Sequence, residues 1–69
     1  MPRVTESLRR RWLAQREQSI EERTHTQSGI PRSPADIAIV DHEIAVMDAM
    51  LALPVGARFD ARQIERDTP

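Results

Sequence analysis

Hydrophobic and polar positions divide the chain into two long helical segments joined by a loop. The pattern predicts a charged helix over residues 4–25 and an apolar helix over residues 34–53. The loop between them, residues 26–33, contains the helix breakers Gly29 and Pro31. No segment alternates apolar and polar residues with the period of two that indicates a β-strand. We therefore expect an all-α fold built on an antiparallel two-helix hairpin.

The capping residues sharpen these boundaries. Thr5 is the predicted N-cap of the first helix and Ser33 that of the second, because a side-chain oxygen there accepts a hydrogen bond from a free backbone N–H. Pro34 suits the first helical position, where a missing N–H costs nothing. Since proline disfavours helical geometry in the residue before it, Pro54 should end the second helix at Leu53.

A short third helix is predicted over residues 61–66. Asp60 and Gln63 have the spacing of a capping box, and Phe59 and Ile64 flank the cap as a hydrophobic staple. So short a helix is unstable unless it docks, so Phe59 and Ile64 are its expected anchors. The alternative is a frayed terminus.

The second helix carries two apolar stripes. The first has the spacing of a coiled-coil seam and consists of Ile37, Val40, Ile44, Met47 and Leu51. The second, about 120° around the helix, consists of Ile39, Val46, Met50 and Leu53. One stripe is covered by the first helix. The other is covered either by the tail or, as we prefer, by another chain, which makes a homodimeric four-helix bundle or a docking surface. Glu43 lies between the stripes, where it either pairs with Arg11 or Arg16 or is solvated at the rim.

The first helix has a narrower apolar stripe that includes Leu8, Trp12, Leu13 and Ile20. Trp12 is either an anchor on the second helix or an exposed contact for a partner. Arg9, Arg10 and Arg16 surround it, which is the pattern of a nucleic-acid surface with a stacking ring. The net charge of −1 opposes that interpretation, because nucleic-acid-binding domains are usually basic.

Length and composition limit the remaining choices. The 69 residues make one small domain, residues 1–69, in which burial and ordering entropy nearly cancel, so a second chain is the expected source of extra buried area. The sequence has no cysteine, no apolar run long enough to cross a membrane and no signal-peptide pattern, so we expect a cytoplasmic protein. All ten basic residues are arginine, and asparagine and tyrosine are absent, a usage that suggests a GC-rich bacterial or bacteriophage genome.

The sequence contains no recognisable catalytic motif. His42 and Glu43 resemble the start of a zinc-protease helix, but H-E-x-x-H requires histidine where this chain has Val46. His25, at the end of the first helix, suits the negative end of the helix dipole. The serines lack the G-x-S-x-G context of a hydrolase. We expect no enzyme, no metal and no cofactor.

The sequence thus favours a non-catalytic protein-binding module, an inhibitor or adaptor that covers a site on a larger protein, such as a bacteriophage-encoded antagonist of a host system. The alternatives are a dimeric nucleic-acid-binding regulator and a structural subunit of a larger assembly such as a virion. The predicted contacts with a partner are Met47, Met50 and Leu53 on the second helix, with Arg9, Arg10, Trp12 and Arg16 on the first.

Overall fold

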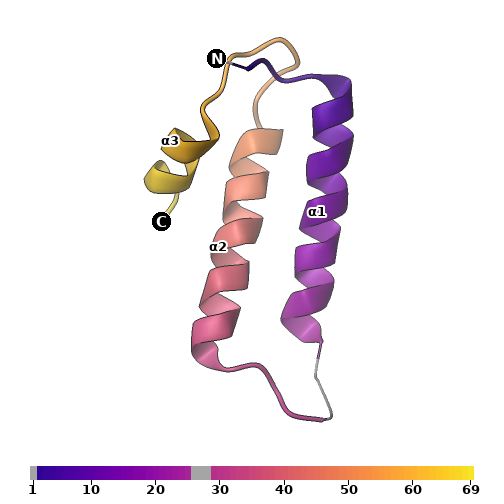
Figure 1. Ribbon diagram of the computed structural model, residues 1–69, viewed down its shortest axis with the longest axis vertical. Helices are drawn as coiled ribbons and strands as arrows, with labels where there is room; N and C mark the ends of the chain where they lie inside the picture. Colours follow the sequence, from indigo (N-terminus) through magenta and orange to yellow (C-terminus); the bar gives the residue numbers. More distant parts are fainter. Residues whose placement is uncertain (1, 26–28) are drawn as a thin grey trace.

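Three helices form the part of the chain that the structure describes. The computed structural model describes residues 2–25 and 29–69, so residues 26–28 of the predicted loop lie outside the described residues. The helices are α1 (Glu6–Thr24), α2 (Pro34–Leu51) and α3 (Ala61–Asp67). α1 and α2 run antiparallel side by side, and α3 packs against α2 (Figure 1). The predicted all-α hairpin with a short C-terminal helix is confirmed.

Each helix begins directly after the N-cap residue that the sequence predicts. Side-chain oxygens accept hydrogen bonds from first-turn backbone N–H groups: Thr5 from Leu8, Ser33 from Asp36 and Asp60 from Arg62. The capping box expected between Asp60 and Gln63 is not closed, because the Gln63 side chain donates to the Asp67 carboxylate one turn later. The caps are local features, so the sequence predicts them well.

Both long helices are shorter than predicted. α1 begins at residue 6 rather than 4, and α2 ends at residue 51 rather than 53. At the end of α2, Leu53 donates its backbone N–H to the Met50 carbonyl, so the chain already turns before Pro54. At the start of α1, Val4 is extended because it pairs with a distant segment.

That segment is residues 56–59, which lie antiparallel to residues 2–4. Val4 N–H donates to the Ala57 carbonyl at 2.8 Å, and Gly56 N–H donates to the Val4 carbonyl at 2.8 Å. Arg3 and Arg58 form the single bridge of this pairing. Val4 is 1% exposed, the most deeply buried large side chain of the described residues. The sequence did not predict this contact.

A tight turn makes the pairing possible. Ala57 N–H donates to the Pro54 carbonyl at 3.1 Å, which closes a four-residue turn. Gly56 is its third residue and has a φ of 92°, a left-handed value that glycine adopts without strain. The turn brings the chain from the end of α2 back over the start of α1.

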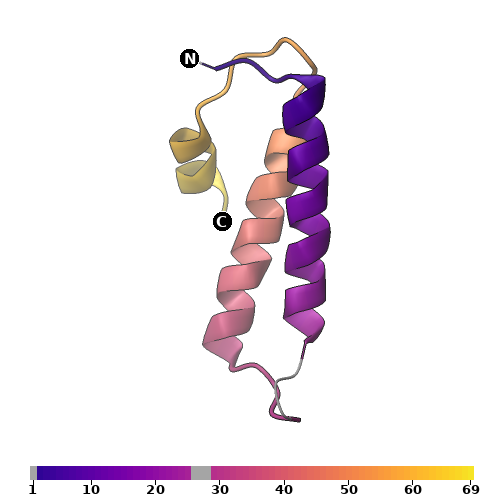
Figure 2. The ribbon, with the colours of Figure 1, turned by 45° about the vertical axis from the view of Figure 1, so that its right-hand side comes forward.

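The core lies at this end of the hairpin. Val4, Trp12, Val46 and Met50 are buried together, and Leu8, Phe59 and Ile64 are among the partly buried residues packed around them. α3 therefore docks through the anchors that the sequence predicts, Phe59 and Ile64. The molecule measures 43 × 23 × 15 Å, so it is a thin layer of helices (Figure 2). No helix of the described residues is long and apolar enough to cross a membrane.

Candidate interaction surfaces

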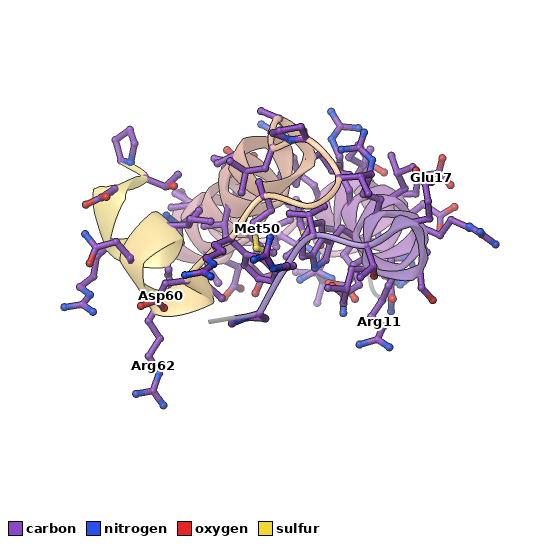
Figure 3. All side chains as sticks on the ribbon, turned by 90° about the horizontal axis from the view of Figure 1, so that it is seen from above. Arg11, Glu17, Met50, Asp60 and Arg62 are labelled. Atoms are coloured by element: carbon purple, nitrogen blue, oxygen red, sulfur yellow. The ribbon has the colours of Figure 1, made fainter. Side chains whose placement is uncertain are left out.

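The α1–α2 layer has two sides. One side carries α3, and we call it the α3 side. In the view along the long axis of the molecule, the side chains of Met50 and Arg11 lie on the same side as α3 (Figure 3). Glu17 points to the opposite side. At 100° per residue, Gln15 and Glu22 lie within about 40° of Arg11 around α1, so they share the α3 side. Leu13 and Ile20 lie about 180° from Arg11, so they belong to the opposite side. We call that opposite side the open face.

Two of the predicted partner contacts are core residues. Trp12 and Met50 are each 5% exposed, so neither offers a surface to a partner while the fold is intact. The Trp12 ring meets Phe59 edge to face, with ring centroids 5.2 Å apart. Met47 and Leu53 are half-buried against the same core. Of the two roles considered for Trp12, the structure shows the anchor.

Arg9, also predicted at a partner surface, caps α2. Its Nη1 donates to the Leu51 carbonyl at 3.0 Å and to the Leu53 carbonyl at 2.9 Å. The last carbonyls of a helix lack intrahelical partners and carry partial negative charge. The Arg9 guanidinium therefore supplies a hydrogen bond to the last carbonyl of α2, at Leu51, and to that of Leu53 just beyond the helix. Arg9 therefore ties the start of α1 to the end of α2.

Arg16 is engaged within the chain as well. Its Nε lies 2.5 Å from Asp48 Oδ1, and about two turns further along α1 Arg23 Nε lies 2.6 Å from Asp41 Oδ1. Both pairs are exposed to roughly half their side-chain area, so each stabilises the hairpin only weakly. Because Trp12 is buried and Arg9 and Arg16 bind their own chain, Arg10 alone of the four residues predicted for nucleic-acid binding keeps an exposed, unpaired side chain among the described residues.

The two apolar stripes of α2 pack against different parts of the chain. The first, Ile37, Val40, Ile44, Met47 and Leu51, faces α1, with Val40 buried and the others half-buried. In the second, Val46 and Met50 are buried by the tail and α3, which corrects the expectation that another chain must cover them. Ile39 lies beyond the reach of α3 and is 60% exposed.

A shallow groove on the α3 side lies beyond the core, toward the loop end of the hairpin. It has a volume of about 310 Å³, and its lining residues are Gln15, Gln18, Ser19 and Glu22 of α1 with Glu43 and Met47 of α2. Glu43 is exposed at its edge, and Arg16 pairs with Asp48 instead, so Glu43 takes the solvated position of the two considered. Met47 is the one predicted contact residue that lines the groove.

Charge is distributed unevenly along the hairpin. The loop end, residues 16–48, holds three arginines against seven carboxylates, a net charge of −4. The opposite end, residues 1–15 and 49–69, holds seven arginines against four carboxylates, a net charge of +3. The groove lies in the acidic half, so its surroundings attract cations.

The two histidines do not come together with other ligands. His25 is the C-cap residue of α1, and its backbone N–H donates to the Glu22 carbonyl. His42 is half-buried on α2. Within residues 2–25 and 29–69 no three His, Asp or Glu side chains gather closely enough to hold a metal ion.

Comparison with known proteins gives no relative. No protein-family model matches the chain, and neither curated proteins nor solved structures show significant similarity to it. Any functional proposal therefore depends on the surfaces described above.

Proposed function

We propose that this chain is a non-catalytic helical module that binds another protein, acting as an inhibitor or adaptor that covers a site on a larger partner. The observation that carries this proposal is the acidic groove between α1 and α2. Its floor includes the apolar side chain of Met47, and its edges carry the carboxylates of Glu22 and Glu43. A methionine floor adapts to different apolar side chains.

The chain's own tail indicates what the groove accepts. On the same side of the layer, the short helix α3 packs on α2 through Ile64, with Phe59 just before it. The groove continues this side toward the loop end, where Ile39 is exposed one turn before Glu43 on α2. A second short helix with an apolar stripe fits this position. Because the surrounding half of the chain carries −4, the partner segment should be basic.

The source and setting are part of the same proposal. A bacterial or bacteriophage origin is supported by the exclusive use of arginine among basic residues. A cytoplasmic partner accords with the lack of cysteine. The specific form that we propose for this module is an antagonist of a host system.

The test uses the full chain as bait and charge reversals in the groove. Proteins that the chain retains from a bacterial lysate are identified by mass spectrometry, purified, and titrated against the chain by calorimetry. We expect Glu22→Arg and Glu43→Arg each to weaken binding by roughly 10-fold or more, since each places a cation against a basic partner. Glu17→Arg is the matched control, because it makes the same charge change on α1, and Glu17 points away from the side on which Arg11 and α3 lie (Figure 3).

Circular dichroism shows whether each variant keeps its helices. If no protein binds, or if the double variant Glu22→Arg/Glu43→Arg binds as tightly as the control, the proposal is wrong. Retention that instead requires Arg10 and weakens steeply with salt would indicate a polyanion partner.

A further inference from the structure

The open face combines exposed apolar side chains with ion pairs. Leu13 and Ile20 are 48% and 38% exposed on the outer flank of α1. The pairs Arg16–Asp48 and Arg23–Asp41 cross from α1 to α2 beside them. α3 and the tail pack on the other side of the layer, so nothing among the described residues covers Leu13 and Ile20. These six residues all lie on the open face.

The exposed area points to a missing neighbour of defined size. The chain has an accessible surface of 5166 Å². A compact protein of this mass exposes about 4,400 Å², so the excess is about 750 Å². A stable protein–protein interface removes about 800 Å² from each partner. The excess is comparable to the area that one partner loses in such an interface, and a molecule only 15 Å thick accounts for it.

The charges on the open face suit a second copy of the chain. Its cations lie on α1, and its anions lie at the same heights on α2. A two-fold axis parallel to the helices places α1 of each copy over α2 of the other. Arg16 then meets Asp48 of the second copy, and Arg23 meets Asp41 of the second copy. A two-fold axis across the helices instead places arginine over arginine and aspartate over aspartate.

We propose that the open face is a homodimer interface in which α1 of each copy packs over α2 of the other. The two hairpins then form a four-helix bundle in which each helix is antiparallel to its neighbours. Leu13 and Ile20 lose their water in the interface, and each carboxylate gains a second guanidinium. Charges joined in such a network contribute more than isolated surface pairs. The proposal does not depend on the proposed function, because the groove lies on the α3 side and stays open in both copies.

The first experiment is sedimentation equilibrium on the full chain over a range of micromolar concentrations. The wild type is expected to be a dimer. Leu13→Glu and Ile20→Glu introduce a carboxylate into the interface, so each should raise the dimer dissociation constant by roughly 100-fold. Ile39→Glu is the control, because Ile39 is 60% exposed but lies on the α3 side. All three positions are exposed enough for the hairpin to keep its fold, which circular dichroism checks.

The second experiment determines whether the two-fold axis of the dimer lies parallel to the helices or across them. The variant Arg16→Glu/Arg23→Glu/Asp41→Arg/Asp48→Arg exchanges the charges of both helices, so the ion pairs within each chain are retained. In the proposed geometry the variant forms its own dimer but does not mix with the wild type, because mixing opposes like charges. With the axis across the helices, mixed dimers are instead favoured. Native mass spectrometry of the mixture separates the species by mass.

Three results would overturn the proposal. The wild type is a monomer at the highest concentration, which leaves the open face to an unlike partner. Ile39→Glu dissociates the dimer while Leu13→Glu and Ile20→Glu do not, which moves the interface to the α3 side. The charge-exchanged variant forms mixed dimers with the wild type, which places the axis across the helices.

Discussion

The rings of Trp12 and Phe59 meet edge to face, 5.2 Å between centroids and 89° between planes. This contact joins α1 to the tail, so it determines whether α3 covers Val46 and Met50. We expect Phe59→Ala to lower the free energy of unfolding by about 3 kcal/mol, through lost burial and a cavity beside Trp12. Urea unfolding followed by the fluorescence of Trp12, the only tryptophan, measures the change.

Phe59→Leu separates the ring contact from simple burial. Leucine keeps most of the apolar volume, so this variant should lower the free energy of unfolding by only about 1 kcal/mol. That is the stabilisation that an aromatic pair adds to the effect of its buried area. Equal losses for the two variants would contradict the edge-to-face contribution.

Arg9 should stabilise the fold through the two carbonyls at the end of α2. We expect Arg9→Gln to lower the free energy of unfolding by about 2 kcal/mol, because two acceptors lose a charged donor in a partly buried place. Arg10→Gln makes the same chemical change at an exposed neighbour and should stay within about 0.5 kcal/mol. Thermal unfolding at one protein concentration compares them. A similar effect of both variants would mean that only the general charge of α1 matters.

Gly56 should tolerate no ordinary L-residue without loss. Its φ of 92° strains a side chain, although a Cβ there would meet no atom within 4 Å. We therefore expect Gly56→Ala to cost about 1–2 kcal/mol for backbone conformation alone. Gly56→Asn should cost less, because asparagine adopts left-handed values more readily. Chemical unfolding of both variants checks the order, and an alanine variant as stable as the wild type would contradict it.

Ser33 should stabilise the start of α2 through its hydrogen bond from the Asp36 N–H, which is 3.2 Å long. Replacing it by alanine should cost about 1 kcal/mol, whereas Ser33→Asp retains an acceptor and should cost little. Hydrogen exchange provides the local measurement, since the Asp36 amide should exchange faster only in the alanine variant. Unchanged exchange would show that the cap contributes nothing.

The sequence predicted the local features of this fold well. Thr5, Ser33 and Asp60 are N-caps as expected, because a cap depends on residues within one turn. The docking of α3 through Phe59 and Ile64 was also predicted, since the staple pattern lies within six residues.

Features that depend on distant residues were not predicted. Val4 was expected in a helix, but it pairs with Ala57, and nothing near Val4 encodes that partner. The capping role of Arg9 and the pairing of Arg16 with Asp48 depend on the register of the hairpin, which periodicity does not determine. For the same reason, nothing in the sequence indicated that Gln15, Gln18 and Glu22 line a groove. Knowledge of the register alone would have placed them opposite Glu43 and Met47.

The pairing of Val4 with Ala57 also governs the order in which the protein folds during synthesis. α1 and α2 are made first, and their contacts are between neighbours in the chain. Val4, however, remains exposed until residue 57 has left the ribosome, and Trp12 waits for Phe59. The nascent chain is thus an open hairpin until residues 56–59 have emerged, and only then can the core close. A chain that ends early, before residue 56, leaves Val4, Trp12 and Met50 uncovered, the kind of apolar surface that proteases and chaperones recognise.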